Sequence, residues 1–178
     1  MGEKIKALEK AIEAFDGKDI SNLKQAATLV EANKAAVDGL ICYCQKGSEN
    51  SAQGASWVLK FWWEKVWWEK GWAFSSPQAT KLIDILIAAK SWQLRLHILQ
   101  LLSGLTIAEN QHEKLYYHLR HCLTDNNKFV RAWSYNGLAE LARQYPLYRD
   151  EVKKLFELAQ NDNGEAASVK ARIRNIKL

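Results

Sequence analysis

A helix-sized pattern recurs along this chain, and its period limits the fold more than any other feature of the sequence. Three segments begin with an aliphatic residue, a basic residue and a small or aliphatic residue, and they start at Leu94, Val130 and Val169. The steps between them are 36 and 39 residues. The segments in between also match, because Lys81-Leu-Ile and Lys114-Leu-Tyr lie 33 residues apart. A period of this length with two helices per repeat is typical of arrays in which each helix pair buries its apolar face against its neighbours.

Apolar residues follow a helical period through nearly the whole chain, and no segment alternates as a strand would. The expected helices cover approximately residues 5–16, 20–32, 34–46, 51–70, 76–88, 91–103, 108–123, 127–144, 148–159 and 164–176. The breaks are short, and no linker is long enough to separate domains. We therefore expect one domain over residues 1–178, with N-terminal helices and a cap in 1–49 and the clearest repeats in 50–178.

The repeated segments resemble HEAT repeats, most clearly over residues 127–176. In that family an Asp in the turn between two helices and an Arg or Lys early in the next helix often form a ladder. Asp125 with Arg131 and Asp162 with Lys170 occupy matching places, whereas no Asp precedes Arg95. The resemblance implies an all-α, right-handed α-α superhelix of about four two-helix repeats with capping helices. Armadillo-like and other helical arrays are alternatives.

Charge and cysteine content bear on partner and compartment. The 25 basic and 20 acidic residues leave a net charge of +5, which permits an anionic partner without requiring one. Cys42, Cys44 and Cys122 are an odd number without CxxC spacing, which favours reduced thiols and a cytoplasmic protein. The chain shows neither the apolar core of a signal peptide nor a run long enough to span a membrane.

Tryptophan is concentrated in one expected helix, where Phe61-Trp-Trp-Glu-Lys is followed by the near-copy Val66-Trp-Trp-Glu-Lys. A step of five residues turns a helix by a net angle of about 140°, so the two copies face different ways. The helical angles also place Trp57, Trp68 and Trp72 in one stripe with Phe61. Such a helix is apolar nearly all round, which fits a helix covered by its neighbours. It also fits an exposed surface for a partner or a second copy of the chain, or a helix lying on a membrane surface.

The sequence contains no recognisable catalytic or phosphate-binding motif. His118 and Cys122 lie four residues apart, as two zinc ligands on a helix can. Cys122 also lies on the apolar stripe with Leu115 and Leu119, which favours a place in the core. We therefore expect no metal, no cofactor and no enzymatic activity.

HEAT arrays generally act as scaffolds for other proteins, and that is what the resemblance implies here. We expect a non-catalytic scaffold that binds a protein or peptide, with the Trp-rich helix as its main contact. The contact residues expected there are Trp62, Trp63, Trp67 and Trp68.

The alternative is a nucleic-acid-binding protein, because some HEAT-like proteins resemble DNA glycosylases that repair alkylated bases. The basic row Arg95, Arg131 and Lys170 would then contact phosphates. The competing interpretation is that this row forms the Asp–Arg ladder or covers the core with its aliphatic stems.

Overall fold

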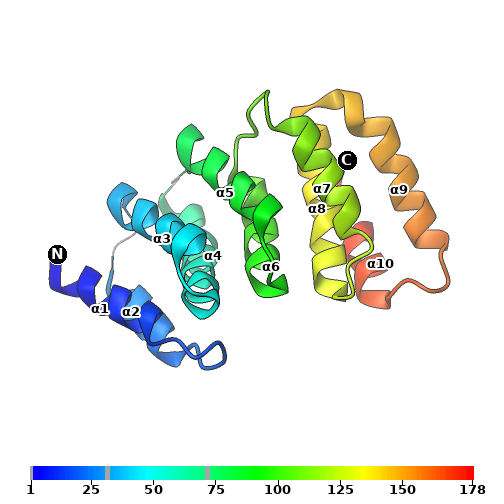
Figure 1. The fold of residues 1–178 in the computed structure, drawn as a ribbon. Coiled ribbons are helices and arrows are strands. Elements are labelled where there is room, and N and C mark those ends of the chain that lie inside the picture. Colours follow the sequence, from blue (N-terminus) through cyan, green and yellow to red (C-terminus); the bar gives the residue numbers. More distant parts are fainter. Residues whose placement is uncertain (1, 31–32, 71–72) are drawn as a thin grey trace.

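The computed structural model describes the backbone of residues 2–30, 33–70 and 73–178, and the side chains of these residues except 2 and 66–70. This part of the chain forms ten α-helices and two 3-10 helices and contains no β-strand (Figure 1). The elements are α1 Gly2–Glu13, α2 Ser21–Leu29, α3 Lys34–Lys46, α4 Glu49–Lys70, α5 Ser76–Ala88, α6 Trp92–Leu101, η1 Leu102–Gly104, α7 His112–Cys122, α8 Lys128–Gln144, η2 Pro146–Tyr148, α9 Arg149–Asn161 and α10 Ala167–Arg174. The prediction of an all-α chain is confirmed for these residues.

Polar side chains at the expected breaks set where several helices begin. Asn33, Ser91 and Asn127 each accept a hydrogen bond from a backbone N–H two or three residues further on, at 3.0, 3.4 and 2.9 Å. Ser75 and Gln78 form a reciprocal capping box at the start of α5. Each cap satisfies an N–H group that the first helical turn leaves without a partner.

Two helices begin later than the periodicity predicts. α7 begins four residues after the expected start, because Ala108 and Gln111 close a turn in which the Gln111 N–H donates to the Ala108 carbonyl at 2.8 Å. Before this turn, the Gln144 side chain accepts from the backbone N–H of Ile107 at 2.9 Å and donates to the carbonyl of Leu105 at 3.0 Å. α10 begins at Ala167 rather than near Gly164.

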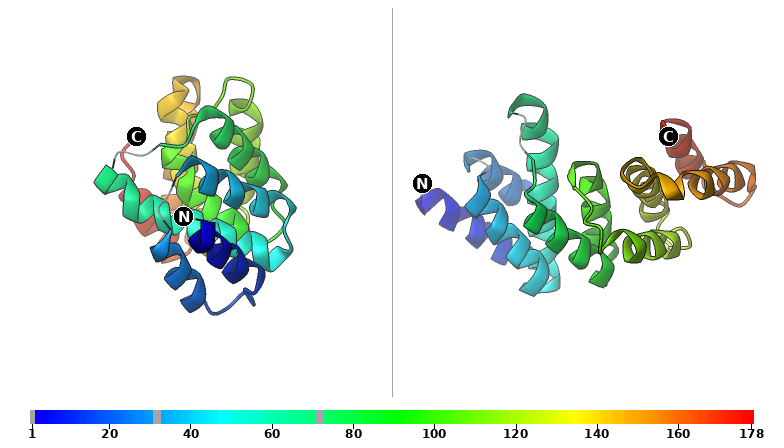
Figure 2. Two further views of the ribbon diagram at one scale, coloured as in Figure 1. Left: turned by 90° about the vertical axis from the view of Figure 1, so that its left-hand side faces the viewer. Right: turned by 90° about the horizontal axis from the view of Figure 1, so that it is seen from above.

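Consecutive helices pack as the pairs α1–α2, α3–α4, α5–α6, α7–α8 and α9–α10. Between pairs, α4 contacts α6, α6 contacts α8 and α8 contacts α10, while α3 contacts α5 and α5 contacts α7. Figure 1 shows α3, α5 and α7 in front of α4, α6 and α8, and Figure 2 gives two further views of the same arrangement. We call α4, α6, α8 and α10 the even layer, and α3, α5, α7 and α9 the odd layer.

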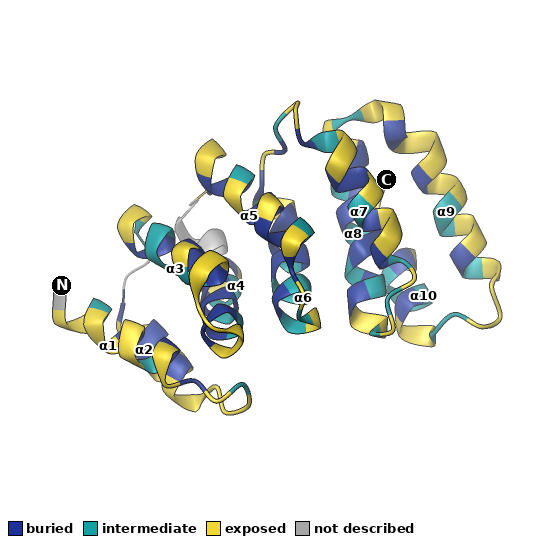
Figure 3. Ribbon diagram, viewed as in Figure 1, coloured by how far each residue is buried: buried dark blue, intermediate teal, exposed yellow. Residues whose placement is uncertain are grey.

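One hydrophobic core extends along the molecule from Leu8 in α1 to Val152 in α9. A smaller cluster joins α8, α9 and α10 and includes Val169 and Ile173. Figure 3 shows the exposed residues on the outward faces of the helices and the buried ones between them. None of the described helices combines the length and the apolar composition needed to cross a membrane.

The ring of Trp63 packs against the backbone at Gly104. A Cβ atom added to Gly104 would lie 1.9 Å from Cη2 of Trp63. Trp63 is 8% exposed, and its ring stacks on Phe74 with the centroids 5.5 Å apart. The missing side chain at Gly104 therefore lets η1 approach the Trp-rich helix α4.

This packing predicts that Gly104→Ala lowers the free energy of unfolding by about 1–3 kcal/mol, because a rigid indole ring must move to admit the methyl group. Urea denaturation followed by circular dichroism measures the change. The control is Gly39→Ala within α3, where an added Cβ meets no atom within 4 Å. That variant should gain about 0.5–1 kcal/mol, the usual advantage of Ala over Gly inside a helix. Equal stability of the two variants would show that Trp63 does not pack tightly on Gly104.

Candidate functional site

Two of the tryptophans expected to bind a partner lie in the core. Trp62 is 4% exposed, and its indole N–H donates to the backbone carbonyl of Ala27 in α2 at 3.0 Å. Trp63 faces η1 and Phe74, as described above. The covering elements α2 and η1 leave almost none of either ring for a partner, which corrects the expectation that Trp62 and Trp63 are surface contacts.

The expected stripe on the same helix is confirmed where the structure describes it. Trp57 and Phe61 stack with ring centroids 5.2 Å apart, and both are half-buried. The side chains of Trp67 and Trp68 lie outside the described residues. Their role in partner binding, and self-association through them, stay predictions.

The basic row is engaged in ion pairs between repeats. Arg131 Nη2 donates to Glu165 Oε1 at 2.8 Å, and Arg131 Nε lies 3.2 and 3.3 Å from the two carboxylate oxygens. Arg95 Nη1 likewise donates to the Asp125 carboxylate. The side chains of the Arg131–Glu165 pair are 19% and 9% exposed, and those of the Arg95–Asp125 pair are 20% and 13% exposed. Each arginine thus pairs with an acid in the turn of the following repeat.

The same two arginines also bind the turn of their own repeat. Arg95 Nη2 donates to the carbonyl of Ala89 at 3.1 Å, and Arg131 Nη1 donates to the carbonyl of Asp125 at 2.8 Å. Both acceptors lie six residues before the arginine. The contacts form a ladder, as expected. Each arginine, however, pairs with an acid in the turn of the next repeat and not with an acid in the turn that precedes it. The carboxylate of Asp125 accepts from Arg95, whereas Arg131 binds only the backbone carbonyl of Asp125.

The third member of the row differs from the other two. Lys170 is half-buried and makes no ion pair with any described residue. Asp162, its expected partner, accepts a hydrogen bond from the backbone N–H of Gly164 at 2.8 Å instead. The carboxylate that continues the ladder is Glu165, which belongs to the same turn. Of the predicted anion contacts, Arg95 and Arg131 are therefore already neutralised within the protein.

A second set of contacts joins the odd layer and was not foreseen from the sequence. Gln78 Nε2 donates to Asp38 Oδ1 at 2.8 Å, and Gln111 Nε2 donates to Asp84 Oδ1 at 3.0 Å. The two glutamines are buried, at 3% and 1% exposed. They are 33 residues apart, the same offset as the segments at Lys81 and Lys114. This repeated Gln was the signal that could have identified the contact.

A row of equivalent positions also crosses the even layer. Ser56 in α4, His97 in α6, Trp133 in α8 and Arg172 in α10 are separated by 41, 36 and 39 residues, in step with the repeat. Ser56 Oγ lies 2.9 Å from His97 Nδ1, and the Arg172 guanidinium lies 3.9 Å from the centre of the Trp133 ring. His97, Trp133 and Arg172 are half-buried. Ser56 therefore contacts His97 at one end of this row, and Trp133 contacts Arg172 at the other end.

The hydrogen bonds around Ser56 define the tautomer of His97. Ser56 Oγ also lies 2.9 Å from the carbonyl of Gln53, which can only accept. A hydroxyl has one proton, so both contacts are satisfied when Ser56 donates to Gln53 and the Nδ1–H of His97 donates to Ser56. Nε2 of His97 is then an unprotonated acceptor. Burial lowers the pKa of His97 to about 4, and the charge of Lys60 adds to the shift.

The cysteine and histidine noted in the sequence form a neutral pair. Cys122 Sγ lies 3.4 Å from His118 Nε2. Burial raises the pKa of Cys122 to about 11 and lowers that of His118 to about 4, so neither group is charged at neutral pH. A reactive thiolate needs the opposite shift. Within the described part of the chain, no three His, Cys, Asp or Glu side chains are grouped so that they could hold a metal ion.

Comparison with known proteins finds no family model and no curated protein that matches the chain.

The ladder predicts that Arg131→Ala lowers the free energy of unfolding by about 2–4 kcal/mol, because it leaves the Glu165 carboxylate in a largely buried site without its partner. Thermal and urea unfolding of the full chain measure the change. The control is Lys34→Ala, which breaks a pair with Asp38 whose side chains are 75% and 40% exposed. It should cost less than about 0.5 kcal/mol. Similar losses in both variants would contradict a structural role for the arginine row.

The lowered pKa of His97 predicts a pH-dependent stability. An unfolded His titrates near pH 6.5, whereas folded His97 gains its proton only near pH 4. Between these values the unfolded chain binds more protons, so stability falls as the pH drops from about 6.5 to 4. Replacing His97 by Gln should reduce this loss by roughly 1–3 kcal/mol in urea titrations at pH 7 and pH 4.5. His121→Gln, at an exposed position, is the control, and an unchanged slope in the His97 variant would contradict the assignment.

Proposed function

We propose that this chain is a short right-handed HEAT-like superhelix that acts as a non-catalytic scaffold and binds an extended peptide of a partner protein across its even layer. The packed helix pairs and the repeat-spaced ladder support the HEAT-like assignment. Four half-buried aromatic side chains of the even layer carry the binding proposal. They are Trp57, Phe61, His97 and Trp133, and we call them the aromatic row.

The aromatic row has the properties of a peptide-binding surface. Trp57 and Phe61 on α4 stack on each other, so their rings are ordered before any partner arrives. Arg172 lies against Trp133 and restricts that ring in the same way. Rigid aromatic side chains lose little conformational entropy on binding and are the residues most often found in interface hot spots. Half-buried rings on adjacent helices can therefore receive successive side chains of an extended peptide.

Charge favours a peptide over a nucleic acid as the partner. The guanidinium groups of Arg95 and Arg131 are bound by carboxylates, so they are not free to replace counterions along a phosphate backbone. The even layer also pairs Lys60 with Glu64 at 3.2 Å, and Arg143 with Glu140. These pairs neutralise four cations of the even layer, while Lys170, Arg172 and Arg174 on α10 have no acidic residue on their own helix. We propose that recognition rests mainly on apolar contact at the aromatic side chains, with little dependence on salt. The three free cysteines are in keeping with a reducing compartment, and we propose a cytoplasmic location.

The proposal predicts that Trp133→Ala weakens peptide binding at least about tenfold, since loss of a hot-spot side chain costs about 2 kcal/mol or more. The probe is a fluorescein-labelled peptide selected from a random 12-residue phage library on the wild-type chain, and fluorescence anisotropy measures its affinity. Trp92→Ala is the matched control. Trp92 is 44% exposed, but it lies five residues from His97 and so on another side of α6. It should change the affinity less than about twofold.

Salt separates the proposed function from the nucleic-acid alternative. The peptide affinity should change little between 50 and 500 mM NaCl, whereas binding of a fluorescein-labelled 20-base-pair DNA duplex would weaken steeply with log salt. Tight DNA binding that is lost in a Lys170→Ala variant, together with no peptide enrichment, would overturn the scaffold proposal.

A further inference from the structure

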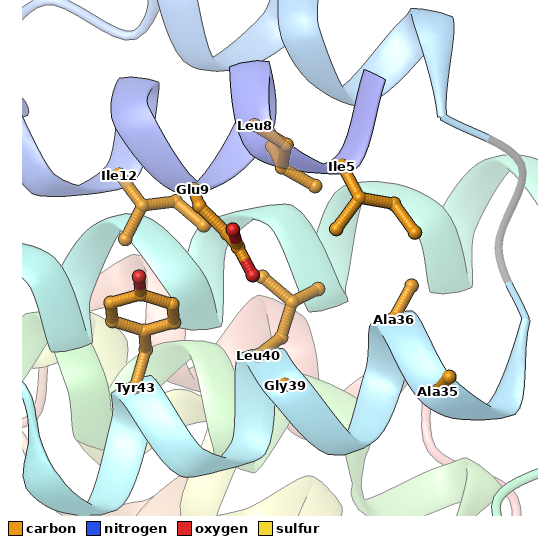
Figure 4. Close-up of a pocket in the computed structure, with 9 residues that line it drawn as sticks. All are labelled: Ile5, Leu8, Glu9, Ile12, Ala35, Ala36, Gly39, Leu40 and Tyr43. Atoms are coloured by element: carbon orange, nitrogen blue, oxygen red, sulfur yellow. The ribbon is translucent and has the colours of Figure 1, made fainter. Parts of the chain in front are cut away.

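A groove separate from the aromatic row opens between α1 and α3 (Figure 4). Its volume is 130 Å³. The residues that define it are Ile5, Leu8, Glu9 and Ile12 from α1, and Gly39 and Leu40 from α3. Leu8, Ile12 and Leu40 belong to the buried core, so the base of the groove is apolar and firmly packed.

Gly39 keeps this groove open. It lies in the middle of α3, where glycine lowers helix stability and alanine would be favoured. Elsewhere a glycine admits a close neighbour, as Gly104 admits Trp63, but a Cβ on Gly39 would meet no atom within 4 Å. Packing within the chain therefore does not account for this glycine. The glycine leaves open space at the wall of the groove.

Glu9 supplies the only charge among the nine residues that line the groove. Figure 4 shows its side chain reaching from α1 toward Leu40. Glu9 forms no ion pair or hydrogen bond with any other described residue. The other polar group, the Tyr43 hydroxyl, already donates to Glu13 Oε1 at 2.8 Å, and this bond raises the pKa of Tyr43 to about 12. The carboxylate of Glu9 is thus left to receive a cation beside an apolar site.

The size of the groove limits what can enter it. A cavity of about 150 Å³ lined by aliphatic side chains holds one benzene ring. The volume here is slightly smaller, which suits one leucine, isoleucine or methionine side chain.

We infer that the groove between α1 and α3 anchors one apolar side chain of a partner peptide, whose adjacent Lys or Arg pairs with Glu9. The site lies on other helices than the aromatic row. It does not depend on the peptide binding proposed for the even layer.

The experiment uses three dipeptide probes that separate the apolar anchor from the charge. They are N-acetyl-leucyl-lysine amide, N-acetyl-leucyl-glutamate amide and N-acetyl-glycyl-lysine amide. Each is titrated into the ¹⁵N-labelled full chain, and amide chemical shifts give the dissociation constant and the place of binding. The leucyl-lysine probe should shift the amides of Gly39 and Leu40. The other two probes should bind at least about threefold more weakly, as expected for loss of an exposed ion pair or of the anchor.

Two variants test the assignment without unfolding the protein. Gly39→Leu places a side chain in open space, so the chain should fold normally and lose binding of all three probes. Glu9→Gln, at an exposed position, should make the lysine and glutamate probes bind equally. Trp133→Ala should leave dipeptide binding unchanged, which separates this inference from the proposed function.

Three results would overturn the inference. The leucyl-lysine probe could shift amides outside α1 and α3, or bind the Gly39→Leu variant as it binds wild type. Light scattering could instead show that the wild type is a dimer and that Gly39→Leu is a monomer, in which case a second copy of the chain occupies the groove.

Discussion

Burial between neighbouring helix pairs is the constraint on which the rest of this structure depends. A single pair of amphipathic helices cannot remove its apolar face from water, so each pair needs the next one. α5 illustrates this, because Leu82, Ile83 and Leu86 are fully buried while the helix contacts α3, α6 and α7. The core is therefore a continuous strip shared between repeats rather than a centre enclosed by one layer.

Apolar contact alone does not determine how one pair sits on the next, and the buried polar contacts supply that register. Arg95 and Arg131 each join the turn of their own repeat to an acid of the following one. In the odd layer the contacts run the other way, because Gln78 and Gln111 each donate to an acid of the preceding helix pair. If one helix pair shifted by a helical turn, a nearly buried guanidinium or carboxylate would lose its partner, and an unpaired buried charge costs several kcal/mol. Such contacts contribute more to a unique arrangement than to net stability.

Much of the helical order could be predicted from the sequence, because periodicity and capping residues are local signals. Asn33, Ser91 and Asn127 mark helix starts in the sequence and act as caps in the structure. The partners of the arginines could not be predicted in the same way. The repeat places Arg131 in the correct series, but only the stacking of repeats decides that it reaches Glu165 rather than a residue of its own turn. Likewise, helical angles place Trp62 and Trp63 on faces of α4 without saying that α2 and η1 cover those faces.

The contrast between two glycines separates a residue that the packing explains from one that it does not. In the sequence, Gly39 lies inside an expected helix and Gly104 directly follows one. In the structure Gly104 faces the rigid indole ring of Trp63, whereas Gly39 faces open space near Glu9, whose carboxylate has no partner among the described residues. Packing within the fold explains Gly104, but it does not explain Gly39. A similar difference separates Arg95 and Arg131, whose guanidinium groups are held by carboxylates, from Trp57 and Trp133, which pack against the core with one part of the ring and stay partly exposed. Under the proposed function, the exposed parts of such side chains are where this protein recognises a partner.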